Sequence, residues 1–384
     1  QETFTRLLPR YFASDSEVGV SLTGGLDTRM IMAALPSETA RPVTYTFCGA
    51  NPGLRDARIA SRVAAACGLR HEVIHIETDF LSNFPDLADR TVWVTDGCFG
   101  PSGAPEIYLN RKARALSPIR LTGNFGSEIL RSMSTLKPLN LASELISPDL
   151  VKVLGSSVSP QHGERTHRVT FAAFEEVPWN LFGSLAAGRS QVTFRTPYLD
   201  NEIVALGFQA PDSVRTSVTS AVEYVQHANP RLGEIPTDRG EGTGNSTFKQ
   251  TMQKGYAEVS LKMDYYCSEG LPFGLAALDP LFQWTSACLG IKGQHKFLSY
   301  RNWLRRELAD YATTRLEEAS RLSLPFIEKG SLRTLARDHI SGRRNRTREI
   351  NAVLTLEAID RLLLNRTGQE TPGVTNLALA AMAR

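Results

Sequence analysis

The chain has 384 residues, 42% of them hydrophobic and 22% charged, which excludes a disordered, a collagen-like or a disulfide-rich protein. Its 43 lysine and arginine residues against 40 acidic residues leave a charge of +3, too small to indicate a nucleic-acid or anionic-membrane partner. No apolar run reaches the roughly 18 residues of a membrane helix. Five scattered cysteines without a CxxC pair, and no secretion leader, favour free thiols in a reducing compartment, so we expect a cytoplasmic protein.

The first two hundred residues alternate between strand-like and helix-like segments. Extended β-branched and aromatic runs end at glycines, and apolar residues recur at helical spacing between them. Asn51 and Pro52 form an expected helix start, and Gly68 an expected end. The pattern predicts strands at Val18–Leu22, Val43–Phe47, His71–Ile76 and Ser117–Gly123, with helices at Thr28–Leu35 and Asn51–Gly68.

This alternation predicts an α/β fold with a mainly parallel, Rossmann-like sheet flanked by helices. From about residue 206 the pattern becomes mostly helical, and it ends in an expected helix at Glu349–Asn365. We therefore divide the chain into an α/β core at 1–205 and a helical part at 206–384. Ligands of parallel sheets bind beyond the carboxyl ends of the strands, which is where the segments TGGLDT and TGNFGSE fall.

The strongest local signal is GVSLTGGLDTRMI, Gly19–Ile31. A strand that feeds a glycine pair at a helix start lets backbone N–H groups approach an anion, and Thr23 and Thr28 add hydroxyl donors. Asp27 would repel a bare phosphate, so its expected role is to hold a Mg²⁺ ion that bridges phosphates. The alternative is a tight turn with a helix-capping aspartate. The segment is neither a Walker sequence nor a GxGxxG loop.

Further segments follow this loop in a regular order. YTFCG is followed by an acidic helix and a His71-Glu72 pair, then by TGNFGSE at Thr122–Glu128 and FRTPYLD at Phe194–Asp200. Together these segments resemble the synthetase domain of the asparagine synthetase family, the N-type ATP pyrophosphatases. The family motifs are SGGLDS, a strand with an acidic helix, SGEGSDE and VRxPFLD. The resemblance covers roughly residues 4–205, and a terminal LTLE-type helix extends it to about residue 365.

The resemblance implies a PP-loop fold of the adenine nucleotide alpha hydrolase type and a site for ATP. ATP would place its phosphates on the Thr23–Thr28 loop, with Mg²⁺ held by Asp27 and Glu128. A carboxylate, aspartate by family analogy, would attack the α-phosphorus, and ammonia or an amine would convert the acyl-adenylate to an amide. The implied nucleotide-binding residues are Ser21, Thr23, Gly24, Gly25, Leu26, Asp27, Thr28, Thr46, Phe47, Thr122 and Gly123.

Departures from the family motifs bear on the chemistry. Asn124 stands where the family has a glutamate that assists adenylate or amide formation, and an amide cannot accept a proton but can orient a substrate. Ser127 replaces an aspartate that is a second magnesium ligand, whereas Glu128 is kept. The basic segment that faces pyrophosphate in the family has no clean match here, and Arg239 and Lys249 are its candidates.

The partners implied by the resemblance are a small-molecule carboxylate and an amine or ammonia donor. A glutaminase of this family begins with a catalytic cysteine, and the first cysteine here is Cys48, inside an expected strand. Ammonia would therefore come from a glutaminase domain upstream of Gln1 or in trans, or be used free. Two alternatives stay open: a relative that adenylates another carboxylate in natural-product or polysaccharide pathways, and a nucleotide-binding protein that has lost turnover.

Overall fold

The structure is a computed structural model of the whole chain. It describes residues 1–36, 41–49, 54–135, 145–150, 152, 167–240, 247–271, 275, 278–291, 293–295, 298–322, 327 and 329–365. The predicted helix start at Asn51 and Pro52 lies outside these residues.

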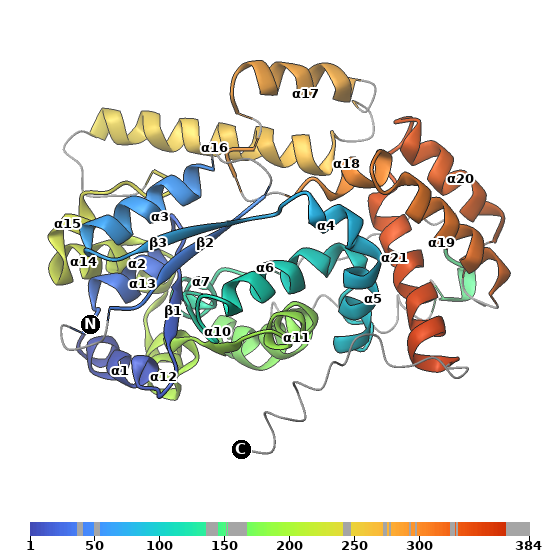
Figure 1. The fold of residues 1–384 in the computed structure, drawn as a ribbon. Helices are drawn as coiled ribbons and strands as arrows, with labels where there is room; N and C mark the ends of the chain where they lie inside the picture. The colour runs from blue at the N-terminus through green and yellow to red at the C-terminus, as the bar shows by residue number, and fades with distance from the viewer. Residues whose placement is uncertain are drawn as a thin grey trace.

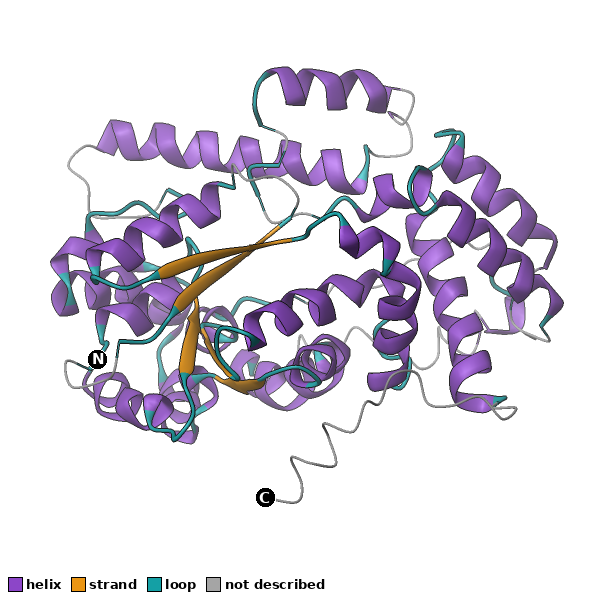
Figure 2. Cartoon of the chain, in the orientation of Figure 1, coloured by secondary structure: helices purple, strands orange, loops and turns teal. Residues whose placement is uncertain are grey.

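One parallel sheet of five strands lies at the centre of the molecule, with helices around it (Figures 1 and 2). The strands are β1 (Val18–Ser21), β2 (Thr44–Cys48), β3 (His71–His75), β4 (Ile119–Thr122) and β5 (Thr193–Arg195). The four predicted strands are confirmed within one or two residues at each end, and β5, which was not predicted, lies at the start of the FRTPYLD segment. All observed strand pairs are parallel, which confirms the predicted α/β class.

The strand order β3-β2-β1-β4-β5 places a change of direction in the middle of the sheet. The chain moves outward from β1 to β3 and then returns to the other side of β1 to form β4. Ser21 pairs with Thr122 at the last position of both strands. The loops that follow β1 and β4 therefore leave the sheet side by side, at the point where sheets of this kind open to ligands.

Helices cover both faces of the sheet. Those of the first two hundred residues are α1 (Glu2–Phe12), α2 (Leu26–Ala33), α3 (Arg55–Ala66), α4 (Asp79–Ser82), α5 (Phe84–Val94), α6 (Ala104–Arg114), α7 (Gly126–Arg131), α10 (Arg168–Phe171), a π-helical segment at Ala172–Asn180, α11 (Phe182–Arg189) and α12 (Asn201–Gln209). The helix α2 begins two residues before its predicted start, because Gly25 is extended and the chain turns helical directly after it.

The second half of the described chain is helical, as predicted (Figure 2). Its helices are α13 (Asp212–Arg215), α14 (Thr219–Ala228), α15 (Pro230–Gly233), α16 (Thr247–Glu269), α17 (Asp279–Cys288), α18 (Tyr300–Arg305), α19 (Ala309–Arg321), α20 (Lys329–Ile340) and α21 (Thr347–Ile359), which continues as a π-helical turn at Asp360–Leu364. Among the described helices, none has both the length and the apolar composition that a bilayer crossing requires.

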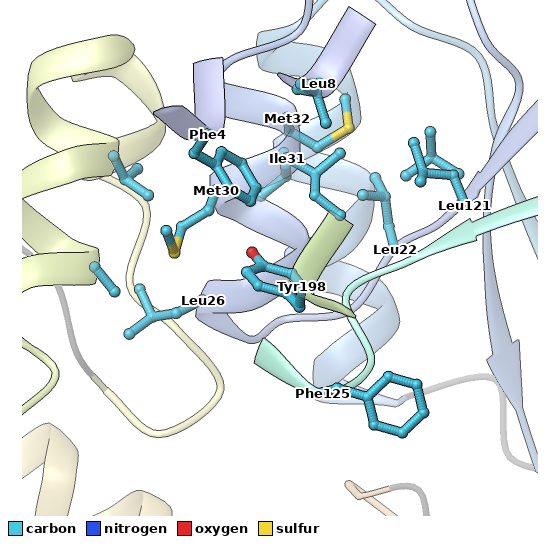
Figure 3. Packing of buried hydrophobic residues seen from close by; sticks show 14 of the residues in the cluster. Phe4, Leu8, Leu22, Leu26, Met30, Ile31, Met32, Leu121, Phe125 and Tyr198 are labelled. Carbon is cyan, nitrogen blue, oxygen red and sulfur yellow. The ribbon is translucent and has the colours of Figure 1, made fainter. Parts of the chain in front are cut away.

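Two large apolar clusters hold the layers together. One joins α1, α2, α3 and α14 to the sheet, and Figure 3 shows the Tyr198 ring in it beside Leu26, at the start of α2. The other joins β2 and β3 to α5 and α6 and to the C-terminal helices α18, α19 and α21. Both clusters contain residues from each side of position 205, so the division at that position stays a prediction.

Candidate functional site

A cavity of about 420 Å³ opens at the carboxyl ends of β1 and β4. This volume falls in the range of small-molecule sites, about 300–1,000 Å³. Its walls come from both glycine loops, from β2 and from α11. The lining residues are Ser21, Thr23, Asp27, Thr28, Phe47, Arg120, Thr122, Gly123, Asn124, Phe125, Ser127, Glu128, Thr135, Leu181, Ser184 and Leu185.

The structure brings most of the predicted site residues together in this cavity. They are Ser21, Thr23, Asp27, Thr28, Phe47, Thr122, Gly123, Asn124 and Glu128. Gly24, Gly25 and Leu26 belong to the same loop but do not line the cavity. Thr46 points elsewhere: it is fully buried and donates its hydroxyl to the carbonyl of Leu22 at 2.9 Å.

The structure does not place either of the two predicted pyrophosphate-facing residues, Arg239 and Lys249, in this cavity. Arg239 is exposed and lines a second cavity of about 480 Å³ together with Lys262 and His295. Burial lowers the pKa of His295, with Asp264 opposing that shift. The side chain of Lys249, in α16, is outside the described residues.

Backbone N–H groups of the first glycine loop are already hydrogen-bonded to side chains. The Gly24 amide donates to Asp56 Oδ1 at 2.5 Å, and the Gly25 amide to Thr23 Oγ1 at 3.2 Å. The Thr23 amide donates to Thr28 Oγ1 at 3.2 Å. The Asp56 carboxylate thus takes an anion's place at the Gly24 amide. The first turn of α2, whose N–H groups have no partner within the helix, is therefore the part of the loop that can face an anion.

The second glycine loop packs directly on the first. A Cβ at Gly123 would lie 2.7 Å from the Thr28 amide nitrogen, and one at Gly126 would lie 2.5 Å from Asp27 Cγ. Neither position has room for a side chain. Between them Phe125 adopts a left-handed backbone with φ of 74°, which costs a non-glycine residue about 1–2 kcal/mol. The strain marks this loop as one that its surroundings hold in place.

Asn124 is fixed by a residue at the end of β4 and by one directly after β5. Its Oδ1 accepts a hydrogen bond from the Thr122 hydroxyl at 3.0 Å, and its carbonyl accepts one from the Thr196 hydroxyl at 2.8 Å. The side chain is exposed on the cavity wall. It can therefore orient a bound group, although it cannot take up a proton.

Arg120 is a lining residue that sequence reasoning missed. Its side chain lies between the rings of Phe47 and Phe194, 4.6 and 5.1 Å from their centroids, and donates to Asn110 Oδ1 at 2.8 Å and to Ser21 Oγ at 3.1 Å. The residue is 8% exposed, and its Nε is buried without a hydrogen-bond acceptor. The sequence signal that could have identified Arg120 as a site residue is its position inside the strand-like run IRLT, directly before a glycine loop.

The two predicted metal ligands have different surroundings. Asp27 Oδ1 pairs with Arg131 Nη1 at 2.8 Å, and its Oδ2 accepts from Arg131 Nη2 and from the Ser127 hydroxyl, both at 2.9 Å. Burial raises the pKa of the Glu128 carboxyl, and the nearby Asp27 raises it further. Arg131 was also missed, although it stands four residues after Ser127, on the same face of a helix.

A divalent ion does not fit this arrangement at Asp27. A metal ligand offers free carboxylate lone pairs, whereas a guanidinium stands against both oxygens of Asp27: Arg131 Nη2 donates to Oδ2, and Arg131 Nη1 lies 2.8 Å from Oδ1, which accepts no hydrogen bond. Within the described part of the chain, no three His, Cys, Asp or Glu side chains gather into a possible metal site. Magnesium bound by Asp27 and Glu128 therefore stays a prediction from the resemblance.

Comparisons with known proteins agree with the predicted resemblance. Residues 2–176 match the family model described as asparagine synthase. Proteins named "Putative asparagine synthetase", glutamine-hydrolyzing, from Mycobacterium bovis and from two strains of Mycobacterium tuberculosis are 24% identical over 231 residues, which are 57% of this chain and 32% of each relative. The chain thus matches about a third of the length of these curated relatives.

Proposed function

We propose that this chain is the synthetase part of an ATP-dependent amide-forming ligase, because residues 2–176 match the family model described as asparagine synthase. The observation that carries the proposal is the cavity at the carboxyl ends of β1 and β4, where both glycine loops meet. Nine of the nucleotide-site, metal-site and catalytic residues implied by the family motifs line this one cavity. Three separate stretches of sequence, 21–28, 47 and 122–128, contribute them, so their meeting does not follow from chain proximity.

The groups around the cavity suit the parts of an adenine nucleotide. The first turn of α2 and the hydroxyls of Thr23 and Thr28 present donors for phosphate oxygens. The Phe47 ring offers an aromatic face for the base, and Thr122 a hydroxyl for the ribose or base. Arg120, with its unused Nε, supplies positive charge at the cavity wall.

The proposed reaction has two steps. The substrate carboxylate attacks the α-phosphorus of ATP and releases pyrophosphate, which leaves an acyl-adenylate. Ammonia or an amine then attacks the acyl carbon, AMP leaves, and the amine loses a proton. Asn124 would orient the reacting groups. Arg239 would have to move toward the cavity to meet pyrophosphate, and Lys249 is the other candidate for that contact.

A second candidate is a relative that activates a carboxylate other than aspartate. The specific observation in its favour is Asn124, which stands where the family has an acidic residue and whose side-chain Oδ1 accepts a hydrogen bond from the Thr122 hydroxyl. This bond holds the amide on the cavity wall in a fixed orientation, as a group that positions a different substrate would need. The proposed chemistry requires a compartment that supplies ATP, such as the cytoplasm.

The amine donor belongs to the same proposal. The relatives' printed names describe glutamine hydrolysis, and this chain matches only about a third of their length. Cys48 is buried in β2, where it is not placed to act as a glutaminase nucleophile. We therefore propose that ammonia comes from a glutaminase upstream or in trans, or from solution.

Substrate-dependent exchange of labelled pyrophosphate into ATP tests the function. Only an enzyme that forms an acyl-adenylate reversibly returns the label to ATP, and a panel of carboxylates with aspartate as one member identifies the substrate. Exchange with aspartate supports asparagine synthesis, and exchange with another carboxylate supports the second candidate. Bound ATP without exchange for any carboxylate would contradict both and favour a nucleotide-binding protein that has lost turnover.

A further inference from the structure

The Asp27 carboxylate is held from inside the protein by the last residue of α7. Arg131 reaches both carboxylate oxygens, at 2.8 Å and 2.9 Å, and also donates to Ser127 Oγ at 2.6 Å. The Ser127 hydroxyl in turn donates to Asp27 Oδ2 at 2.9 Å. The side chains of Arg131 and Asp27 are 10% and 18% exposed. The three groups therefore form a closed, largely buried unit.

This unit forms one wall of the cavity. Asp27 and Ser127 line the cavity, whereas Arg131 is not among its lining residues and stands behind them. Tyr198 donates its hydroxyl to the Asp27 carbonyl at 2.7 Å, which fixes the residue at the start of α2. A Cβ built at Gly126 would lie 2.5 Å from Asp27 Cγ and Oδ1, so the second glycine loop passes close beside this carboxylate.

A guanidinium and a divalent ion would compete for the same carboxylate. The Arg131 guanidinium donates to Asp27 Oδ2 and lies 2.8 Å from Oδ1, so its positive charge faces both oxygens. A second cation bound there would have to displace Arg131 from Asp27 or share the carboxylate with it, and two like charges at one largely buried carboxylate repel each other. Ser127 stands beside this pair, and the next residue, Glu128, is the further acidic group on the cavity wall, with a pKa raised by burial and by the nearby Asp27.

We propose that Arg131 is the built-in counter-ion of the phosphate loop: it neutralises Asp27, so that the cavity binds the phosphates of ATP without a divalent ion held by Asp27. The proposal rests on the proposed nucleotide binding and names what balances the charge at that site. Arg131 acts through Asp27 and is a positioning residue. It replaces the repulsion between Asp27 and a phosphate with a locally neutral wall.

Calorimetric titration of ATP in excess magnesium and in EDTA tests this. The full chain should bind ATP in EDTA within about threefold of its affinity in magnesium. In Arg131→Gln the bare Asp27 charge should make binding in EDTA about tenfold weaker or more, while magnesium restores it. Arg131→Lys should lie between the two, since it keeps the charge but loses the fork.

Arg361→Gln is the matched control, because Arg361 also donates to both oxygens of one aspartate, Asp89, at 2.7 Å. For Arg361→Gln, the ratio of the ATP affinity in magnesium to that in EDTA should equal the ratio of the unchanged chain. Thermal unfolding verifies that each variant is folded. ATP binding by the unchanged chain only in magnesium would overturn the proposal and leave the proposed function standing. Absence of ATP binding under both conditions would contradict both. If Arg131→Gln does not fold, the unchanged chain and Arg131→Lys still decide.

Discussion

Two regions of the molecule contain an arginine whose guanidinium faces both carboxylate oxygens of one aspartate. At the sheet edge Arg131 holds Asp27, and in the helical half Arg361 from the turn after α21 holds Asp89 of α5. The distances are similar, at 2.8–2.9 Å and 2.7 Å. The pairs nevertheless have different neighbours.

The Asp89–Arg361 pair lies within a network of charges that joins three helices. Glu357 of α21 accepts from Arg361 Nε at 2.7 Å, and Arg315 of α19 approaches both acidic residues. The Asp27–Arg131 pair has instead a serine, two glycine loops and a cavity beside it. The same side-chain chemistry thus fastens helices in one place and sets the charge of a cavity wall in the other.

The largest expected effect concerns the stability of the helical network. Arg361→Met removes the partner of Asp89 and of the buried Glu357 and should lower the free energy of unfolding by about 3–4 kcal/mol. Urea denaturation measures it. The variant that also carries Asp89→Asn should lose less, because fewer charges are left unpaired. Equal losses in both variants would show that the pair does not act as a unit.

A buried histidine in the same half predicts a dependence of stability on pH. Burial, together with the nearby charges of Arg305 and Arg301, lowers the pKa of His339 to about 4. Its Nδ1 accepts from the Arg346 amide at 3.1 Å, which requires the neutral ring. The unfolded chain binds the proton first, so stability is full above pH about 6.5 and falls by up to about 3 kcal/mol toward pH 4. Urea denaturation across this range should show a flatter slope for His339→Gln, and an unchanged slope would refute the assignment.

Two glycines give a contrast of opposite sign. Gly126→Ala pushes a methyl group against Asp27 and should destabilise the protein by about 2 kcal/mol and weaken ATP binding. Gly255→Ala, in an exposed stretch of α16 with nothing within 4 Å, should stabilise it by about 0.5–1 kcal/mol. Thermal unfolding and ATP titration of both variants measure the difference. A tolerated Gly126→Ala would mean that the two loops are less tightly packed than described.

Asn124 tests whether polar groups at the cavity act on substrate. If Asn124 positions the substrate, Asn124→Ala should slow pyrophosphate exchange about tenfold, or ~1.4 kcal/mol in the transition state. If Asn124 only fills the place of the family's lost glutamate, Asn124→Ala should change the exchange rate little, and Asn124→Glu should raise activity with aspartate. Equally large losses of exchange activity in both variants would exclude the hypothesis that Asn124 only fills the place of a lost glutamate.

The sequence predicted the elements that local signals define. Strand ends and glycine loops were found because glycines, hydroxyls and β-branched runs occur together around Thr23 and Thr122. Thr46 and Phe47 show the limit: successive residues of a strand face opposite sides, so only Phe47 reaches the cavity. The Asp89–Arg361 pair joins residues 272 positions apart, and no local pattern announces it.

The sequence marks Arg120 and Arg131 as charged residues beside the motifs, but it does not predict their partners. Each is a lone charge beside a motif, and its meaning depends on which neighbour the fold supplies. Arg120 lies opposite Phe194 because β4 pairs with β5. The sequence analysis did not predict β5. The helix α7 carries Arg131 back to Asp27, 104 residues earlier in the chain.

A structure of the protein with a non-hydrolysable ATP analogue, prepared in EDTA, tests the central claim most directly. The account predicts the base beside Phe47 and Thr122, the phosphates at the first turn of α2, and Arg131 still paired with Asp27. An analogue bound elsewhere, or Arg131 released and Asp27 facing the phosphates bare, would contradict it.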